Sequence, residues 1–220
     1  TDGAPFADGD LPDDAAQRHA RLLQFFVEHA GVTTLALFCD WAGLTQRDAR
    51  QALEHADLET ITAEGLGDAA LATPGLSALL RKIDKAGEAI AFLPFEDNLI
   101  HLAGGLSHFV LEKLHGLPVP TWGDMKGKDT LSPLGKARHV MFRSILAEGR
   151  VRGFWEYDPD QRIVATHLFD PPAKAVRATI DAAAHDLARF LDAELGHGHS
   201  FSLDDDDELR RRLALLRKMR

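Results

Sequence analysis

The sequence predicts an α+β fold that is rich in helices and has short antiparallel β-hairpins. In several segments the apolar residues recur every three or four positions, which is typical of amphipathic helices. Other segments are short, alternate polar with apolar residues and lie beside Gly, Asp or Pro, as the strands of hairpins do. The 220 residues, 45% of them hydrophobic, suit one large or two small domains with ordinary cores.

The first part of the chain is predicted to be an arm, three helices and a hairpin. Residues 1–14 are rich in Gly, Pro, Asp and Ala without any period, which indicates a linker or arm. Gly31 and Gly43 mark helix ends, and Thr45 with Asp48 resembles a capping box. The expected elements are a helix over 15–29, a short helix ending at 43, a third helix starting at 45, a hairpin over 58–72 and a helix over 74–82.

This order predicts a winged helix-turn-helix over residues 15–82, with the hairpin as the wing. The residues of the third helix expected to pack inward are Leu44, Ala49, Ala52 and Leu53. Those expected to face outward are Gln46, Arg47, Arg50, Gln51 and Glu54. Because Gln and Arg reach base edges in the major groove, Gln46, Arg47 and Arg50 are candidate DNA-binding residues.

The same segment also fits a module that only packs against other protein. Any surface helix can carry two arginines, and the predicted wing is poorly basic because it holds the acids Glu59, Glu64 and Asp68. DNA contact and protein packing therefore both stay open for this helix.

A second, winged-helix-like α+β unit is predicted over residues 86–196. Its expected elements are a buried strand over 89–95, the aromatic-rich strand RVRGFWEYD at 150–158, a partner strand RIVATHLF after the turn DPDQ, and a helix over 173–195. The stretch 98–122 is ambiguous, with a loop expected near Pro118 and Pro120. Residues 197–220 are expected to form a charged C-terminal tail.

Positive charge is concentrated in two places on an otherwise acidic chain of net charge −9. The first is the candidate phosphate-binding set Lys126, Lys128, Lys136, Arg138, Arg143, Arg150 and Arg152. A basic face of this kind attracts phosphate locally, although a solvated loop would carry the same residues. The second is the terminal RRRLALLRKMR, which suits either DNA contact or capping of the fold through Leu209, Leu213 and Leu216.

Composition excludes several classes of protein. Cys39 is the single cysteine, so an intrachain disulfide and a cysteine-based zinc site are impossible. No apolar run is long enough to cross a bilayer, and the acidic N-terminal residues do not resemble a signal peptide. We expect a cytoplasmic protein with no membrane partner. The chain begins with Thr, and so we expect a processed chain or a piece of a longer one.

Neither a metal nor a cofactor is expected, despite 11 histidines. His101, His108 and His115 recur every seven residues, which would place them on one helical face if that region were helical. His197 and His199 lie in a Gly-rich stretch, and no HExxH-type spacing occurs. Trp41, Trp122 and Trp155 are more typical of core anchors than of base-stacking platforms.

The segments ALFCDWAGLTQRDARQAL, AIAFLPFEDN and SILAEGRVRGFWEYD together resemble a known family. They are similar to the winged-helix DNA-binding superfamily that includes AlkZ-like, YcaQ-type DNA glycosylases, with LPFEDN and GRVRGFWE the more specific matches. The resemblance covers most of residues 15–195 and looks like the second and third of three winged-helix units. It implies binding of double-stranded DNA and excision of alkylated or crosslinked bases.

The catalytic residues that the resemblance implies are not found in this chain. The family carries Gln, an apolar residue, then Gln or Asp on a hairpin of its first unit, whereas Gln46-Arg47-Asp48 has a charged middle residue and starts a helix. Asp97, which with Glu96 follows the strand over 89–95, is a weak candidate for the carboxylate that activates water in glycosidic hydrolysis. An ordinary turn or helix cap at Asp97 is the alternative.

The sequence thus predicts a DNA-binding protein that resembles base-excision glycosylases and appears without their catalytic unit, so its status as an enzyme stays open. It is expected to act on damaged duplex DNA as a monomer. The alternative is a non-enzymatic winged-helix regulator or protein-interaction module, and a regulator of this type would dimerise on a two-fold site.

Overall fold

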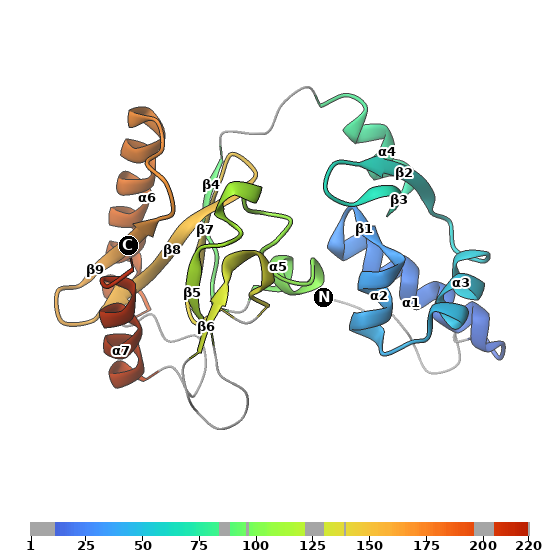
Figure 1. Cartoon of the computed structure of the whole chain (residues 1–220), viewed down its shortest axis with the longest axis horizontal. Helices are drawn as coiled ribbons and strands as arrows, with labels where there is room; N and C mark the ends of the chain where they lie inside the picture. The colour runs from blue at the N-terminus through green and yellow to red at the C-terminus, as the bar shows by residue number, and fades with distance from the viewer. Residues whose placement is uncertain are drawn as a thin grey trace. The chain divides into compact units, whose positions relative to one another are not determined.

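The chain divides into two compact units in a computed structural model, with the boundary between Asp84 and Lys85. The structure describes residues 12–83, 89–95, 97–121, 130–138, 140–195 and 205–219. Both units contain helices and small antiparallel sheets, which confirms the predicted α+β class (Figure 1). None of the helices in the described ranges has the length and apolar character needed to cross a membrane.

Unit 1 follows the element order that was predicted for residues 15–82. Its elements are α1 (Ala15–Ala30), β1 (Thr33–Thr34), α2 (Leu35–Ala42), α3 (Gln46–Leu53), β2 (Glu59–Ala63), β3 (Gly67–Ala72) and α4 (Pro74–Leu80). The strands form one antiparallel sheet in the order β1-β3-β2. This arrangement of three helices and a hairpin is compatible with the predicted winged helix.

Local capping explains where the short helices of unit 1 begin and end. Gly43 closes α2 with a left-handed φ of 66°, a conformation that glycine adopts without steric cost. Two residues later, Thr45 caps α3 by accepting a hydrogen bond from the Asp48 amide at 3.2 Å. In a capping box the side chain at the position of Asp48 accepts from the backbone amide of the cap residue. Here Asp48 Oδ2 accepts instead from the Thr45 hydroxyl, at 2.7 Å.

The core of unit 1 combines aromatic rings with small side chains. Phe26 of α1 and Phe38 of α2 are buried with ring centroids 5.6 Å apart. Ala49 and Ala52 of α3 are fully buried, which lets α3 pack closely against α1. Trp41 stacks on Phe26 at 5.0 Å yet leaves 46% of its surface exposed, so it covers this core from outside.

Unit 2 is built on a sheet of four antiparallel strands in the order β4-β7-β8-β9. Its elements are β4 (Ile90–Phe92), α5 (Asn98–Leu102), the 3₁₀ turns η1 (Glu112–Leu114) and η2 (Leu134–Lys136), β5 (Pro118–Thr121), β6 (Thr130–Pro133), β7 (Arg143–Ala147), β8 (Arg150–Asp158), β9 (Ile163–Leu168), α6 (Lys174–Ala193) and α7 (Asp206–Leu216). This order does not repeat that of unit 1. The second winged-helix-like unit over residues 86–196 stays a prediction.

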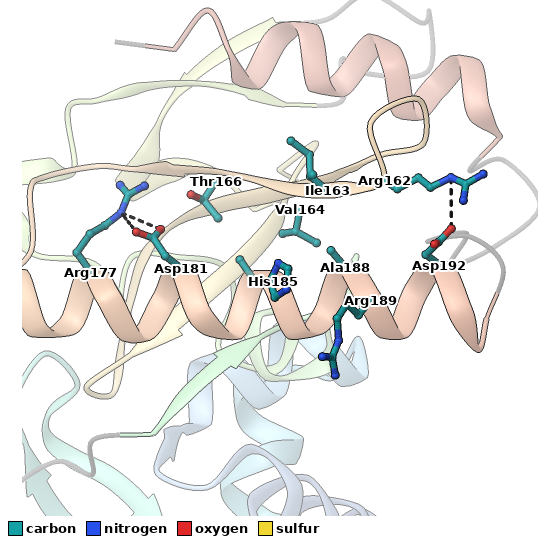
Figure 2. A pocket seen from close by; sticks show the side chains of 11 residues that line it. Arg162, Ile163, Val164, Thr166, Arg177, Asp181, His185, Ala188, Arg189 and Asp192 are labelled. Atoms are coloured by element: carbon teal, nitrogen blue, oxygen red, sulfur yellow. Dashed lines mark hydrogen bonds and ion pairs between the residues drawn. The ribbon is translucent and has the colours of Figure 1, made fainter.

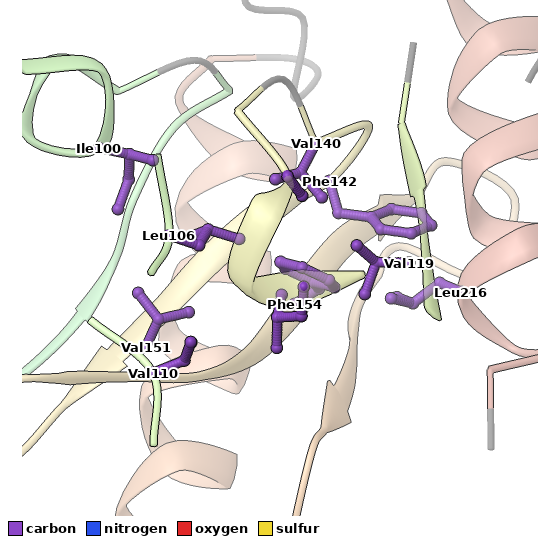
Figure 3. Close-up of a cluster of buried hydrophobic side chains, with 11 residues drawn as sticks. Ile100, Leu106, Val110, Val119, Val140, Phe142, Val151, Phe154 and Leu216 are labelled. Atoms are coloured by element: carbon purple, nitrogen blue, oxygen red, sulfur yellow. The ribbon is translucent and has the colours of Figure 1, made fainter. Parts of the chain in front are cut away.

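The two faces of this sheet bury different cores because side chains alternate along a strand. Trp155 and Tyr157 of β8 pack on one face with Ile180 and Leu191 of α6. Phe154 of β8 packs on the other face, in the cluster that Figure 3 shows together with Leu216 of α7. The sheet is therefore covered on one side by α6 and on the other by α7 together with residues of α5, β5 and η2.

Two sequence predictions for unit 2 need correction. Residues 205–219 do not form a separate tail, because α7 packs on β8 with Leu209, Leu213 and Leu216 buried. Of the two alternatives for this segment, capping of the fold is the one observed. Pro118 and Pro120 lie in β5, not in a loop, and pair with β6 in a two-stranded sheet of its own. Edge strands accept proline because their outer N–H groups need no partner.

Candidate nucleic-acid interface

The outward face of α3 carries polar and basic side chains, as the sequence predicted. Gln46, Arg47 and Arg50 are exposed, and so is Gln51. Neither arginine makes an ion pair with any residue that the structure describes, so both guanidinium groups face solvent. The buried alanines behind them fix the helix to α1. This face is rigid, polar and locally positive.

The β2–β3 hairpin adds acids to the surface of unit 1. Glu64 is exposed in the turn between β2 and β3, and Asp68 is exposed near the start of β3. Glu59 of β2 is partly exposed and pairs with Arg81, which follows α4, at 3.3 Å. The hairpin is therefore an unfavourable surface for phosphate.

Arg143 is the clearest departure from the predicted phosphate-binding set. It is 1% exposed in β7, forms an ion pair with Glu156 of β8, and lies over the Trp155 ring at 5.2 Å. A buried arginine already paired with a carboxylate cannot reach a phosphate, so the prediction that Arg143 binds phosphate is wrong. The signal for its burial was Glu156, which lies 13 residues away.

Glu156 holds a second buried arginine from the C-terminal helix. Arg212 of α7 donates from Nε to Glu156 Oε2 at 2.5 Å, and its guanidinium lies over the Phe95 ring at 5.6 Å. Burial raises the pKa of Glu156, while Arg143 and Arg212 pull that pKa back down. The net shift in this pKa is upward, with burial as the largest cause, and the two guanidinium groups flank the one carboxylate. Part of the basic C-terminal run therefore serves the core and not a ligand.

The remaining members of the predicted set differ in how accessible they are. Lys136, at the end of η2, and Arg150, at the start of β8, are exposed without an ion pair to any described residue. Arg138 is also exposed. Arg152 is only 21% exposed and donates to Glu148 at 2.5 Å. Lys126 and Lys128 lie outside the described residues. Lys136, Arg138 and Arg150 are thus the accessible cations of this set.

Arg150 projects from a tight hairpin turn between β7 and β8. The turn consists of Glu148 and Gly149, with φ values of 55° and 71°, between the paired residues Ala147 and Arg150. Positive φ at both central residues is the signature of a type I′ hairpin, whose twist matches that of the strands. The turn therefore holds Arg150 at the tip of a rigid ribbon.

Asp97 lies where a helix cap is needed. Its Oδ1 accepts a hydrogen bond from the Leu99 amide at 2.8 Å and so caps α5. Beside it is a cavity of about 20 Å³ whose polar lining comes from Asp97, His101, Arg138 and Ser144. This volume suits a single water molecule and not a nucleobase. The structure thus brings Asp97 and Arg138 together, but only around a water-sized space.

The histidines do not assemble into a metal centre in the described part of the chain. His101 lies in α5, whereas His108 and His115 lie in turns, so the seven-residue spacing does not form one helical face. No group of three His, Cys, Asp or Glu side chains there is close enough to bind a metal ion. His197 and His199 lie outside the described residues.

A groove in unit 2 was not predicted from the sequence. It runs between β9 and α6, has a volume of about 390 Å³, and is lined by Arg162, Arg177 and Arg189 together with Asp181, His185, Asp192 and smaller side chains (Figure 2). These charges come from the β8–β9 turn and from α6, and basic and acidic residues are mixed along the chain. No local run of basic residues therefore pointed to the groove.

Comparison with known proteins identifies the family. The family model described as DNA glycosylase AlkZ-like matches residues 2–190. The chain belongs to this family. Membership confirms the resemblance drawn from the helix-turn-helix, LPFEDN and GRVRGFWE segments. It supports a DNA-binding, repair-related function.

A solved structure shows the same fold. Streptomyces sahachiroi DNA glycosylase AlkZ aligns with a TM-score of 0.57 and 17% sequence identity over 82% of this chain. The alignment covers 44% of the AlkZ chain, so the present chain spans less than half the length of that glycosylase. The comparison with curated proteins gives no match. At this identity the structural match establishes the fold alone.

Proposed function

We propose that this chain binds double-stranded DNA, with unit 1 acting as a winged helix whose α3 enters the major groove. The observation that carries the proposal is the division of α3 into two faces: Ala49 and Ala52 are fully buried, while Gln46, Arg47 and Arg50 are exposed. Gln and Arg side chains on such a face can donate to base edges and phosphates. Lys136, Arg138 and Arg150 of unit 2 supply further phosphate contacts.

The role we infer is positioning of damaged duplex DNA for removal of alkylated or crosslinked bases, by a cytoplasmic protein that binds as a monomer. Family membership supports repair as the setting. Asp97 is the residue of the described part that we would test for hydrolysis of an N-glycosidic bond, although its capping bond to Leu99 accounts for its position. Its conversion to Asn should leave DNA binding unchanged.

A titration of the chain against a labelled 20- to 25-mer duplex tests the proposal. One duplex is plain and one carries an alkylated site, and each is measured at two salt concentrations. Conversion of Arg47 and Arg50 to Gln should weaken binding of both duplexes and lower its salt dependence by about 0.9 log units per lost phosphate contact. Arg81→Gln with Lys82→Gln, which removes two exposed charges just after α4, is the matched control and should leave binding unchanged.

Two results would contradict the proposal. If the chain binds no DNA even at low salt, the proposed DNA contact is wrong. If the control variant weakens binding as much as the α3 variant does, α3 has no specific role.

Glu64 and Asp68 of the β2–β3 hairpin favour one other function, a protein-interaction module, because acids there repel phosphate. That function predicts a partner protein whose binding is lost when these two acids become Lys.

A further inference from the structure

The groove between β9 and α6 contains arginines whose ion pairs leave most of their donors unused. Arg177 contacts Asp181 through Nε alone, at 2.9 and 3.0 Å to the two carboxylate oxygens. Arg162 likewise faces Asp192 through Nε, at 3.6 Å. A guanidinium has five N–H donors, four of them on the Nη atoms. Within the described residues, the Nη groups of both arginines donate to no acceptor.

The carboxylates orient the guanidinium groups instead of neutralising a buried charge. The side chains of Arg177 and Asp181 are 48% and 52% exposed, and those of Arg162 and Asp192 are 70% and 39% exposed. Exposed pairs of this kind contribute about 0–1 kcal/mol to stability. Their more specific effect is geometric, because a carboxylate on Nε fixes the plane in which the Nη fork lies. An oxyanion can then bind the fork while the ion pair stays in place.

Arg162 is also held by its backbone. It lies in the turn between β8 and β9 with a φ of 54°, which is uncommon for a residue other than glycine. Its amide donates to the Asp158 carbonyl at 2.8 Å, which fixes the turn. Such a conformation costs about 1–3 kcal/mol and tends to be found where it places a functional side chain. Here it directs a largely exposed arginine to one end of the groove.

Each end of the groove carries an arginine, and the two ends lie at a separation suited to a polyanion. Figure 2 shows Arg177 beside Thr166 at one end and Arg162 beside Asp192 at the other. The 15 residues from Arg177 to Asp192 correspond to about 22 Å along the helix. One strand of B-DNA rises 3.4 Å per nucleotide, so this length is about six nucleotides. Arg189, without an ion pair to any described residue, adds a third cation.

From these contacts we propose that the β9–α6 groove binds phosphodiester groups of one DNA strand, with Arg162, Arg177 and Arg189 as the contacting residues. Asp181 is a positioning residue that orients the Arg177 guanidinium by accepting two hydrogen bonds from its Nε, and Asp192 forms an ion pair with Arg162. Thr166, beside Arg177, and His185, between the ends, donate further hydrogen bonds to phosphate oxygens. The inference rests on the proposed DNA-binding function and adds to it a contact surface on unit 2 that is separate in sequence from the basic set at 126–152.

Salt-dependent titration of the labelled duplex tests this surface. The variant with Arg162, Arg177 and Arg189 all changed to Gln should lower the slope of log affinity against log salt by about 2.7, at about 0.9 per contact. Between 50 and 200 mM salt, the wild-type affinity should therefore fall about 40-fold more than that of the variant. The control variant changes Arg210 and Arg211 of α7 and Lys218, which follows α7, to Gln and removes the same charge from unit 2. Its slope should stay at the wild-type value.

Asp181→Asn separates orientation from net charge. If charge alone mattered, removal of this carboxylate would tighten DNA binding, whereas loss of orientation should weaken it. In the Arg177→Gln background, Asp181→Asn should have no further effect on the affinity, as expected for a residue that acts through Arg177. Tighter binding by Asp181→Asn, or the same loss in both backgrounds, would overturn the positioning role.

The outcomes distinguish this inference from the function on which it rests. If Arg47→Gln with Arg50→Gln weakens binding while the groove variant keeps the wild-type slope, the groove proposal is wrong and the α3 proposal stands. If the wild-type chain binds no DNA, both fail. Equal, groove-dependent binding of a labelled polyglutamate peptide would also overturn the proposal, because the groove would then recognise acidic protein segments.

Discussion

Units 1 and 2 use their arginines in opposite ways. In unit 1, Arg47 and Arg50 stand on a helix whose buried face is alanine, and both are exposed. In unit 2, Arg143 and Arg212 are fully buried around Glu156 and hold β7, β8 and α7 together. The comparison shows that local basic charge is a poor guide to a binding surface. What decides the role of an arginine is whether it is buried against a carboxylate from another element, as Arg143 and Arg212 are, because an exposed pair such as Arg162 with Asp192 leaves the guanidinium accessible.

The largest effect that tests this comparison is expected from Glu156→Gln. The substitution keeps the shape of the side chain but leaves Arg143 and Arg212 buried without a counter-charge. Breaking a buried ion pair in this way costs about 3–5 kcal/mol. Urea denaturation followed by circular dichroism should show that unit 2 unfolds at a lower urea concentration, while the unfolding of unit 1 is unchanged.

The control for this prediction is Arg210→Gln. Arg210 is exposed on α7 and pairs with Asp160 at 2.9 Å, so its loss should cost no more than about 1 kcal/mol. Equal destabilisation by the two variants would contradict the distinction between buried and exposed arginines. A Glu156→Gln protein as stable as the wild type would contradict it as well.

The second prediction concerns the close packing that presents α3 in unit 1. Ala52→Leu adds three carbon atoms where the alanine is fully buried, and overpacking of this kind costs about 1–3 kcal/mol. The unit 1 transition should shift to lower urea, and DNA affinity should fall because α3 is displaced. Gln51→Leu is the adjacent control, and its exposed position predicts a stability change within about 0.5 kcal/mol. Similar losses for the two variants would show that α3 does not pack as described.

Much of the fold could be predicted from the sequence because its signals are local. The strand at Arg150–Asp158 has the predicted bounds, and the inward and outward faces of α3 follow from helical spacing. Gly43 and Thr45 mark the turn between two helices through their own backbone preferences. Each of these features depends on residues a few positions apart.

The features that could not be predicted depend on distant partners. Arg143 belongs to a basic run in the sequence, and its burial follows from Glu156 and from Arg212 of α7. Pro120 suggested a loop because the sequence does not show that β5 pairs with β6. The β9–α6 groove likewise needs the sheet in place before Arg162 and Arg177 line one surface. Pairing between elements, and not local propensity, determines these sites.

A third and smaller effect is expected at the start of α3. Thr45→Ala removes the side chain that accepts from the Asp48 amide, and loss of such a cap costs about 1 kcal/mol. Thr45→Ser keeps the hydroxyl and should retain most of the stability. Because Gln46 and Arg47 are the first residues of the helix, fraying should also weaken DNA binding, measured by fluorescence anisotropy. An affinity unchanged in Thr45→Ala would mean that the first turn of α3 takes no part in binding.

The smallest predicted effect is a pH dependence that belongs to unit 2. Burial lowers the pKa of His108 and of His167, and His115 lowers that of His108 further. In the folded state, the pKa values of both histidines lie below the ordinary value of 6.5. The unfolded state therefore binds more protons just below neutral pH. The stability that these histidines contribute is present above this pH range and is lost as the pH falls. Because both side chains are partly exposed, the loss should be small.

Urea denaturation at pH 7.5 and 5.5 should show a lower midpoint for unit 2 at pH 5.5. The double variant His108→Asn, His167→Asn should reduce this difference. A difference that the double variant leaves unchanged would assign the pH dependence to other groups.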